Sequence, residues 1–463
     1  MSFLRKNFKA MPTKAAKCRT LSFPAKRFRF EKSYCLDLGR EMAKLISIVN
    51  GAVCLAVGIA SVTPAFAGGL ERGGYNIDQL FDASPFTFSS GVTYVMPQRK
   101  LKNVRDTDAT DGLGTNGVGG GTTYADDSEN FAIPYVGVKG GYGPVDCLID
   151  YSQPFGAHLN PGSDWVGVQS NIETKVRTDN YGLTCSYKFD AGPGQFRVIG
   201  GGFYQEIEGF KTRLVAPITG PAAALYSGVG RLEMSDEAAG WRAGIAYEIP
   251  EYALRASLVY NSRVKYDNLS GTLDLTQIPS AVNPLNPFLG RRFGVVGSAE
   301  APDSLELKVQ TGIAPDWLAF GSVKWTNWSL IQSIGFCPVA STGLPCPSGG
   351  VTSLDLLYRD GWTVSGGVGH KFNDKLSGAL SLTWDRGTST GVGAQTDTWT
   401  LGAGVSYAVN DNVELRLAGA VGLLTSGSSG AVTRGGVVYG DDVAYDFGND
   451  IVTAVSTSLK VKF

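Results

Sequence analysis

The 463-residue chain contains 61 glycines, 22 phenylalanines, 19 tyrosines and 8 tryptophans, a composition typical of antiparallel sheets with many turns. Residues 1–67 hold 12 of the 41 basic and 3 of the 42 acidic residues, so the rest of the chain has a formal net charge of −10. This charge argues against nucleic acid as a partner. After residue 67 no apolar run reaches the roughly 18 residues of a membrane-spanning helix, so any membrane role must use strands.

Residues 1–41 form a basic extension in front of a complete export signal. A start codon assigned too far upstream is the simplest interpretation, and a transit peptide is the alternative.

Residues 42–67 predict a secretory signal peptide. Lys44 gives a positive start, residues 45–60 form an apolar core, and residues 64–67 read Pro-Ala-Phe-Ala, the small-x-small pattern of a cleavage site. A transmembrane anchor is the alternative, but the apolar core is short for one. We therefore expect cleavage after Ala67 and export of the remaining chain.

Residues 68–85 show no clear periodicity, and strands alternate with turns from residue 86 to the end. About 14 strands are predicted, at 86–103, 130–141, 144–154, 177–189, 195–210, 228–248, 252–266, 295–313, 317–331, 353–370, 375–386, 396–408, 412–424 and 450–463. Short turns rich in Gly, Pro, Asn and Asp alternate with long loops, which is the pattern of an outer-membrane barrel. The predicted fold is an all-β transmembrane antiparallel β-barrel over residues 86–463.

The strands also alternate between an apolar and a polar face. In residues 451–463, every second side chain is mostly apolar and the others include Lys460 and Lys462. The polar faces of other strands carry Arg242, Lys308 and Glu414, and we expect such charges to pair with one another in the lumen.

Four cysteines follow the predicted signal: Cys147, Cys185, Cys337 and Cys346. An even count in an exported chain predicts disulfides, with three possible connectivities. Cys337 and Cys346 flank one loop, and Cys147 and Cys185 fall in neighbouring strands, so we expect these two pairs. A zinc site is disfavoured because no CxxC motif or histidine lies nearby, and the sequence predicts no metal and no cofactor.

In these features the chain resembles the FadL/TodX-type outer-membrane transporters of hydrophobic compounds. The resemblance is carried by the strand count, a short segment before the first strand, the sequence SGVTYVMP at residues 90–97, and DYSQPFG at residues 150–156. The aromatic terminus, Phe463, is similar to that of outer-membrane barrels generally, where it is a signal for the barrel-assembly machinery.

The resemblance implies a mechanism. The N-terminal segment folds into the lumen as a hatch, an apolar ligand such as a long-chain fatty acid lands between extracellular loops, and it leaves sideways through a kink in the third strand. Two features depart from the family: the hatch is short, and Ser84-Pro85-Phe86 stands where the family has Asn-Pro-Ala. The candidate hatch residues are Phe81, Ser84, Pro85 and Phe86.

Two long loops, residues 211–227 and 281–293, are unusually apolar and are candidate ligand-binding sites. Arg291 and Arg292 in the second loop are candidate partners for a carboxylate head group, and lipopolysaccharide phosphates are the alternative partner. Packing of the loops against each other is the alternative to ligand binding. The candidate residues are Leu214, Val215, Ile218, Leu225, Tyr226, Phe288, Arg291 and Arg292.

The end of the third strand contains residues that interrupt strand pairing. Pro154 lacks a backbone donor and Gly156 tolerates a bend, so Tyr151, Pro154, Phe155 and Gly156 are candidates for a lateral exit. A strand that simply ends in a loop is the alternative.

Enzyme chemistry is not supported. His158 and His370 are the only histidines after residue 67, and they fall at opposite ends of the predicted barrel. Neither has a nucleophile motif around it. The glycine runs do not lie between a strand and a helix, so they are not phosphate loops.

The sequence thus predicts a passive transporter of hydrophobic small molecules in the outer membrane of a Gram-negative bacterium, in contact with membrane lipid and lipopolysaccharide. A general or solute-specific porin and a surface adhesin or structural barrel are the alternatives.

Overall fold

The computed structural model describes residues 68–108, 121–219, 222–339 and 352–463. The predicted extension, residues 1–41, and the predicted signal peptide, residues 42–67, lie outside the described residues. No helix in the described ranges is long and apolar enough to cross a membrane.

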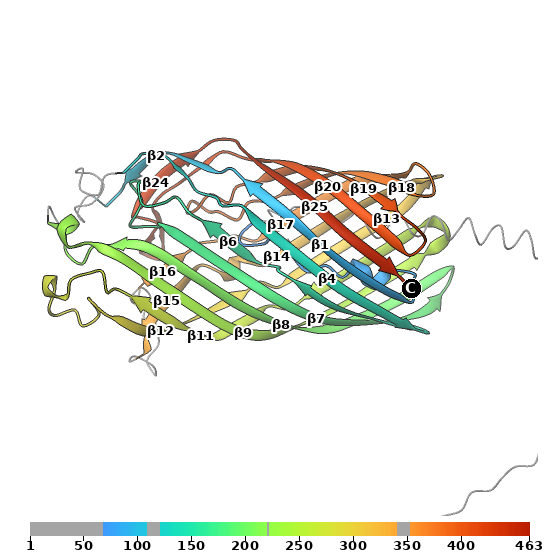
Figure 1. The fold of residues 1–463 in the computed structure, drawn as a ribbon, viewed down its shortest axis with the longest axis horizontal. Coiled ribbons are helices and arrows are strands. Elements are labelled where there is room, and N and C mark those ends of the chain that lie inside the picture. The colour runs from blue at the N-terminus through green and yellow to red at the C-terminus, as the bar shows by residue number, and fades with distance from the viewer. Residues whose placement is uncertain (1–67, 109–120, 220–221, 340–351) are drawn as a thin grey trace, which may run out of the picture. The chain divides into compact units, whose positions relative to one another are not determined.

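The described residues form one antiparallel barrel with a wall of 14 passages, which confirms the predicted fold class (Figure 1). Five of these passages consist of two consecutive strands. In wall order the strands are β1 (Phe86–Pro97), β4 (Phe131–Tyr142), β5 (Val145–Ser152) with β6 (Gly156–Leu159), β7 (Glu173–Ala191), β8 (Gly194–Val215), β9 (Gly228–Ile249), β10 (Leu254–Asn261) with β11 (Val264–Asp274), β12 (Arg292–Ala301) with β13 (Ser304–Ala314), β14 (Trp317–Thr326) with β15 (Ser333–Pro338), β16 (Thr352–Asp355) with β17 (Gly361–Lys371), β18 (Leu376–Asp385), β19 (Thr398–Ala408), β20 (Val413–Leu424) and β25 (Asp450–Lys462).

The last strand closes the barrel against the first. β25 pairs with β1 from Lys462 opposite Thr87 to Val452 opposite Pro97. The Phe463 amide donates to the Phe86 carbonyl at 2.9 Å, and the two rings lie 5.4 Å apart. The C-terminus and the short turns lie at the same end, as the alternation of loop lengths predicts (Figure 1).

The first predicted strand, 86–103, is too long. The wall strand β1 ends at Pro97, which has no amide to donate to a ladder. The chain then enters a small sheet at the long-loop end, made of β2 (Lys100–Asp106), β3 (Ala125–Asp126), β21 (Gly427–Ser429) and β24 (Val443–Phe447).

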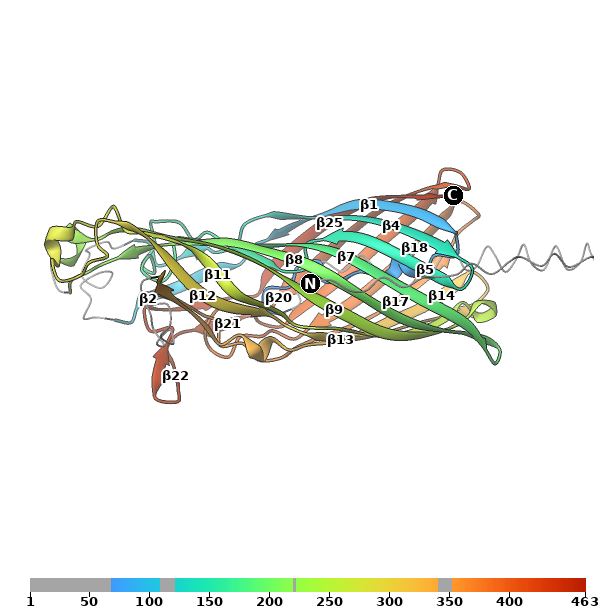
Figure 2. The ribbon, with the colours of Figure 1, turned by 90° about the horizontal axis from the view of Figure 1, so that it is seen from below.

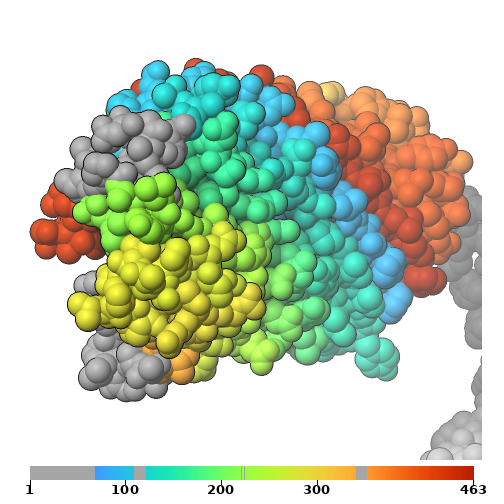
Figure 3. All heavy atoms as spheres, turned by 60° about the vertical axis from the view of Figure 1, so that its left-hand side comes forward, coloured from blue at the N-terminus to red at the C-terminus, as the bar shows by residue number. Residues whose placement is uncertain are grey.

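The long loops build the remaining local structure at that end. The hairpin of β22 (Val432–Arg434) and β23 (Val437–Tyr439) projects from it (Figure 2). Residues of β11, β12 and their connection, coloured yellow, form a lobe beside the green residues of the β8–β9 connection (Figure 3). Of the short 3₁₀ helices, η2 (Ala223–Tyr226) and η4 (Ser280–Val282) belong to long loops. The others are η1 (Asp78–Phe81) before β1, η3 (Pro250–Tyr252) in the short β9–β10 turn, and η5 (Trp328–Leu330) between β14 and β15.

The wall has an apolar outer face and a polar inner face. Along β19, Leu401 and Val405 are exposed on the outside, whereas Thr400 and Ser406 are buried. Such a wall matches lipid outside and a polar interior. The predicted pairing of lumenal charges is confirmed at Glu414, which forms ion pairs with Arg416 and Lys462. It is wrong for Arg242, whose side-chain nitrogens have no hydrogen-bond partner among the described residues.

Cys147 of β5 and Cys185 of β7 are opposite residues in the ladder and form a disulfide. Cys337 of β15 is disulfide-bonded. Cys346, its expected partner, lies outside the described residues.

Candidate functional site

Residues 68–85 lie against the inner face of the barrel. Ile77, Leu80 and Phe81 are buried in one cluster with Leu148 and Ile199, which belong to wall strands. Burying these side chains inside an otherwise polar lumen stabilises the segment there, by about 1.5–3 kcal/mol for each large apolar side chain. The segment therefore fills lumen space that an open pore would leave to water.

Ion pairs join the same segment to several wall strands. Glu71 pairs with Lys324 of β14, Asp78 with Lys308 of β13, and Asp82 with Lys460 of β25. All three carboxylates are buried, and a buried charge is tolerated only when it is paired and hydrogen-bonded. The acidic residues of the segment thus match lysines that point into the lumen.

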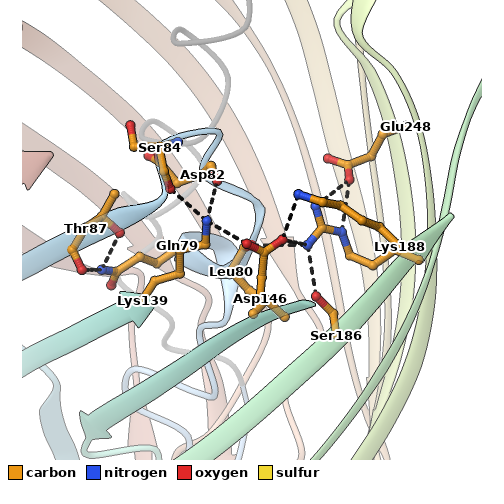
Figure 4. A network of polar contacts seen from close by, with 11 residues as sticks. Gln79, Leu80, Asp82, Ser84, Thr87, Lys139, Asp146, Ser186, Lys188 and Glu248 are labelled. Carbon is orange, nitrogen blue, oxygen red and sulfur yellow. Dashed lines mark hydrogen bonds and ion pairs between the residues drawn. The ribbon is translucent and has the colours of Figure 1, made fainter. Parts of the chain in front are cut away.

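Backbone contacts add to these ion pairs near the short-turn end. The Lys139 ammonium donates to the carbonyls of Asp82 and Ser84 at 2.9 and 2.8 Å, and it also pairs with Asp146 at 2.8 Å (Figure 4). The Gln79 amide donates to Thr87 of β1. These contacts hold the last turn of the segment before it enters the wall.

The third passage of the wall is broken where the sequence places its strand breakers. β5 ends at Ser152 and β6 starts at Gly156, and both pair with β7. At the break, the N-terminal segment takes over the pairing: the Arg72 amide donates to the Pro154 carbonyl at 2.9 Å, and the Gly156 amide donates to the Leu70 carbonyl at 2.7 Å. The N-terminal segment and the break therefore form one hydrogen-bonded unit.

The ladder between β4 and the third passage also has a gap. It runs from Tyr142–Val145 to Tyr135–Ser152, whereas residues 131–134 pair only with β1. The Arg72 guanidinium stacks over the Phe131 ring at 4.1 Å beside this gap. Arg72 is buried, and its Nε and Nη2 atoms have no hydrogen-bond partner in the described part of the chain. A cavity of about 150 Å³ adjoins the gap, lined by Gly73, Pro134 and Gln153 among others.

On the long-loop side of the break lies an apolar cavity of about 100 Å³. Leu70 of the N-terminal segment and Phe155 of the break form part of its lining, together with Trp328 and Tyr266, which are buried. Most of the remaining lining comes from β7, β8, β9, β11, β12, β15 and β16, and includes Ile207, Met234, Leu269, Ala299, Ile334 and Phe336.

A more polar vestibule of about 300 Å³ lies next to the apolar cavity, at the long-loop end. Thr174, Lys211 and Leu354 line both spaces and so mark their boundary. The Lys211 ammonium forms no ion pair within the described residues. A cation at the mouth of an apolar space is suited to an anionic head group whose tail lies inside.

Two buried polar groups mark the same region. The indole nitrogen of Trp328 and the hydroxyl of Tyr358 have no hydrogen-bond partner among the described residues, and such groups are rare in native proteins. In the vestibule, burial raises the pKa of the Asp127 carboxyl to about 6, although the nearby Arg99 lowers it. Asp127 therefore keeps its proton up to a higher pH than an exposed aspartate does.

The predicted loop residues lie outside both spaces. Leu214 packs beside Trp165 in a loop cluster, and Val215 and Phe288 pack against a second cluster around Leu273. None of the eight candidate loop residues lines the cavity or the vestibule. Ile218 is half-buried, Leu225 and Tyr226 are exposed, the Arg291 carbonyl accepts from Leu275, and Arg292 pairs with Asp274.

The other predicted residues are spread over the site. Phe155 lines the apolar cavity, and Tyr151 donates to Asp179 of β7. Phe81 lies in the buried cluster described above, whereas Ser84, Pro85 and Phe86 lie at the short-turn end, where the Pro85 carbonyl accepts from Gly141 at 2.7 Å. Lys211 and Trp328 were not among the predicted residues, because nothing in a single strand distinguishes them from other lumenal residues.

A closed lipid-facing barrel with an occupied lumen and an apolar cavity is the architecture of an outer-membrane transport protein. The model of the family "Outer membrane protein transport protein (OMPP1/FadL/TodX)" matches residues 85–378. The chain belongs to this family and is an outer-membrane β-barrel. This membership agrees with the prediction that the chain is not an enzyme.

Among curated proteins, the chain is 30% identical over 119 residues to a long-chain fatty acid transport protein of Escherichia coli O6:H1, which covers 23% of this chain and 25% of that protein. It is 26% identical over 151 residues to the Salmonella typhi protein of the same name, covering 32% of each. The matched part thus spans only a quarter to a third of the length of these relatives.

Among solved structures, a Pseudomonas aeruginosa FadL homologue aligns with a TM-score of 0.69 at 15% identity, over 86% of this chain and 96% of that one. The toluene transporter TodX of Pseudomonas putida aligns with a TM-score of 0.54 at 14% identity, over 86% and 96%. At these identities the likeness concerns the fold.

Proposed function

We propose that the barrel takes up hydrophobic small molecules with an acidic head group, such as long-chain fatty acids, and passes them from the cell surface toward the membrane without coupled energy. The observation that carries this proposal is the apolar cavity beside the broken third passage. Leu70 of the N-terminal segment and Phe155 of the break form part of its lining. The curated relatives, which are named as long-chain fatty acid transport proteins, support the choice of ligand.

Capture begins in the vestibule at the extracellular end. The Lys211 ammonium stands at the boundary between vestibule and cavity and is free of ion pairs in the described chain. A carboxylate head group pairs with it, and the alkyl tail displaces water from the apolar lining. The apolar loop residues then serve mainly to build the rim around this entrance.

Residues 68–85 act as the hatch in this proposal. Their ion pairs and their buried cluster hold them in the lumen, so ions do not pass freely, whereas a ligand in the cavity touches Leu70 directly. Ligand binding and movement of the segment are thereby coupled through one apolar contact.

Release is lateral, through the gap between β4 and the third passage. The missing ladder pairs at residues 131–134 leave the wall without backbone bonds there, and the Arg72 side chain stands beside the gap. Withdrawal of the segment carrying Arg72 opens a route from the cavity to the membrane.

Two partner assignments are proposals of the same kind. The exposed terminal Phe463 is the feature for recognition by the barrel-assembly machinery. Membrane lipid and lipopolysaccharide surround the outer face, whose exposed side chains are mostly apolar.

The test combines conductance with ligand binding. The purified barrel is placed in planar bilayers and titrated with a fluorescent long-chain fatty acid. We expect saturable binding and no steady single-channel conductance. Steady conductance without binding of the acid would identify a porin instead, and the absence of both would favour an adhesin or structural barrel.

A further inference from the structure

The first described residue, Gly68, is held by a buried carboxylate of the wall. Its backbone nitrogen donates to Asp385 Oδ1 at 2.6 Å. The other carboxylate oxygen, Oδ2, accepts from the Thr363 hydroxyl at 2.7 Å. Asp385 ends β18 and is only 5% exposed, so a carboxylate from the wall reaches the exact start of the lumenal segment.

Asp385 has no basic side chain as a direct partner among the described residues, although the charge of the more distant Lys324 acts on it. No ion pair joins this carboxylate to a lysine, arginine or histidine in the described residues. Lys324, a lumenal lysine, is paired with Glu71. A carboxylate that is buried with only two neutral donors is unfavourable. The free-energy cost of removing its charge from water is offset only by an opposite charge or a full set of hydrogen bonds.

Gly68 also fits its place tightly. A Cβ atom at this position would lie 2.5 Å from Thr388 Cγ2 and 2.7 Å from the Arg386 carbonyl oxygen. Gly69 has a φ of +76° and lies against the Trp328 ring. The position therefore requires glycine and leaves little freedom for the nitrogen to move away from Asp385.

Gly68 is the residue that directly follows the predicted cleavage site at Ala67. Hydrolysis of the Ala67–Gly68 peptide bond by the protease that removes export signals adds one water. The C–N bond breaks, the new carboxylate leaves on Ala67, and the Gly68 nitrogen becomes an ammonium with three donors and a positive charge.

We propose that the α-ammonium of Gly68, created by removal of the export signal, forms a buried ion pair with Asp385 and anchors the first residue of the mature chain in the barrel. The neutral amide of the precursor cannot supply this charge. Together with the pairs of Glu71, Asp78 and Asp82 to wall lysines, this pair holds both ends of the segment. Here the positive charge belongs to the segment and the negative charge to the wall, whereas in the other three pairs the segment is negative.

The test measures how fast the α-amine reacts. The full chain is expressed, exported and purified from outer membranes, and its intact mass gives the first residue, which we expect to be Gly68. The folded barrel is then treated with 2-pyridinecarboxaldehyde, a reagent selective for N-terminal amines. In the native protein we expect labelling at least about tenfold slower than after unfolding, since a charge-assisted buried pair shields the amine.

Two variants test the pair itself. Asp385→Asn keeps the shape but removes the charge, and we expect labelling about tenfold faster than in the native barrel. Asp397→Asn is the matched control: Asp397 lies nearby in sequence and accepts bonds from Trp384 and Gly387 but does not contact Gly68, so its labelling rate should equal that of the native protein. Folding of each variant is checked by heat-modifiable gel migration.

An insertion of one alanine between Ala67 and Gly68 is the second route, since it moves the ammonium by one residue and leaves Asp385 intact. We expect it also to label about tenfold faster than the native barrel, and it decides the matter if Asp385→Asn does not fold. A mature chain that begins at another residue, or equal labelling of the native and altered barrels, overturns the proposal. No ligand enters this measurement, so its outcome is independent of the transport proposal.

Discussion

Two apolar regions lie near the extracellular end, and they differ in what their side chains do. At the end of β8, Leu214 packs within a loop cluster, and in the following loop Leu225 is 79% exposed. In the apolar cavity, residues from widely separated strands, such as Ile334 and Met234, surround a space that Leu70 also lines. The apolar run between β8 and β9 therefore packs against neighbouring loops or stays exposed. The apolar cavity is formed instead by single residues that separate strands bring together.

A charge placed in either apolar region shows which of the two binds ligand. Ile334→Asp puts a carboxylate into the apolar cavity, where it must be desolvated or excluded. We expect the affinity for a fluorescent fatty acid to fall by about a hundredfold, which corresponds to about 2.7 kcal/mol. Leu225→Asp is the control and should change the affinity by less than about twofold. A large loss of affinity in Leu225→Asp with none in Ile334→Asp would show that the ligand binds at the loop and not in the cavity.

The next largest effect concerns the head group. Lys211→Gln removes the charge at the boundary between vestibule and cavity, and we expect about a tenfold loss of fatty acid affinity. An uncharged hydrocarbon probe should bind as before. Lys175→Gln serves as control. Lys175 is exposed on β7, and its neighbour Thr174 is the residue that pairs with Lys211 across the ladder. Equal losses for the acid and the hydrocarbon would show that Lys211 acts through packing rather than charge.

A smaller effect is expected at the break in the wall. A side chain at Gly156 would meet Arg72 Nε and the Val176 carbonyl oxygen, each at 2.8 Å, so Gly156→Val should push the N-terminal segment away from the break. We expect ion conductance in planar bilayers to rise above that of the native barrel. Gly140→Val is the matched control, since no atom lies within 4 Å of a Cβ there. Equal conductance of the two variants would show that contact between the N-terminal segment and the break does not limit ion flow.

The smallest effect is that of pH on the stability of the region around the vestibule, which Asp127 lines. Burial raises the folded-state pKa of Asp127 to about 6, above its unfolded value of about 4. Protonation of Asp127 therefore favours the folded state. The free energy of unfolding rises as pH falls from above 6 toward 4, and this gain is lost again as pH rises. We expect the unfolding temperature to increase by a few degrees over this range. Asp127→Asn should flatten that increase, and an unchanged slope would assign it to another group.

The sequence was most informative about the wall. Alternating faces and alternating turn lengths predict the 14 passages, because strand periodicity and hairpin chemistry are local properties. Breaks within passages were less predictable. Pro302 separates β12 from β13 and has a clear signal, whereas Ser262 and Arg263, which separate β10 from β11, have none.

The candidate site was predictable only in part. Pro154 and Gly156 mark the break through their own backbone chemistry, and Phe155 between them lines the cavity. Lys211 and Trp328 depend on contacts between strands far apart in sequence, which periodicity does not encode. The same holds for the match of Asp78 and Asp82 to lumenal lysines.

Photolabelling can locate the tail of a bound fatty acid in the barrel. A long-chain fatty acid with a diazirine at the end of its tail is bound to the native barrel and irradiated, and the adducts are mapped by mass spectrometry. The cavity account predicts adducts on peptides that contain Phe155, Trp328 or Phe336, which line the apolar space. Adducts confined to the loop residues 214–226 would contradict it.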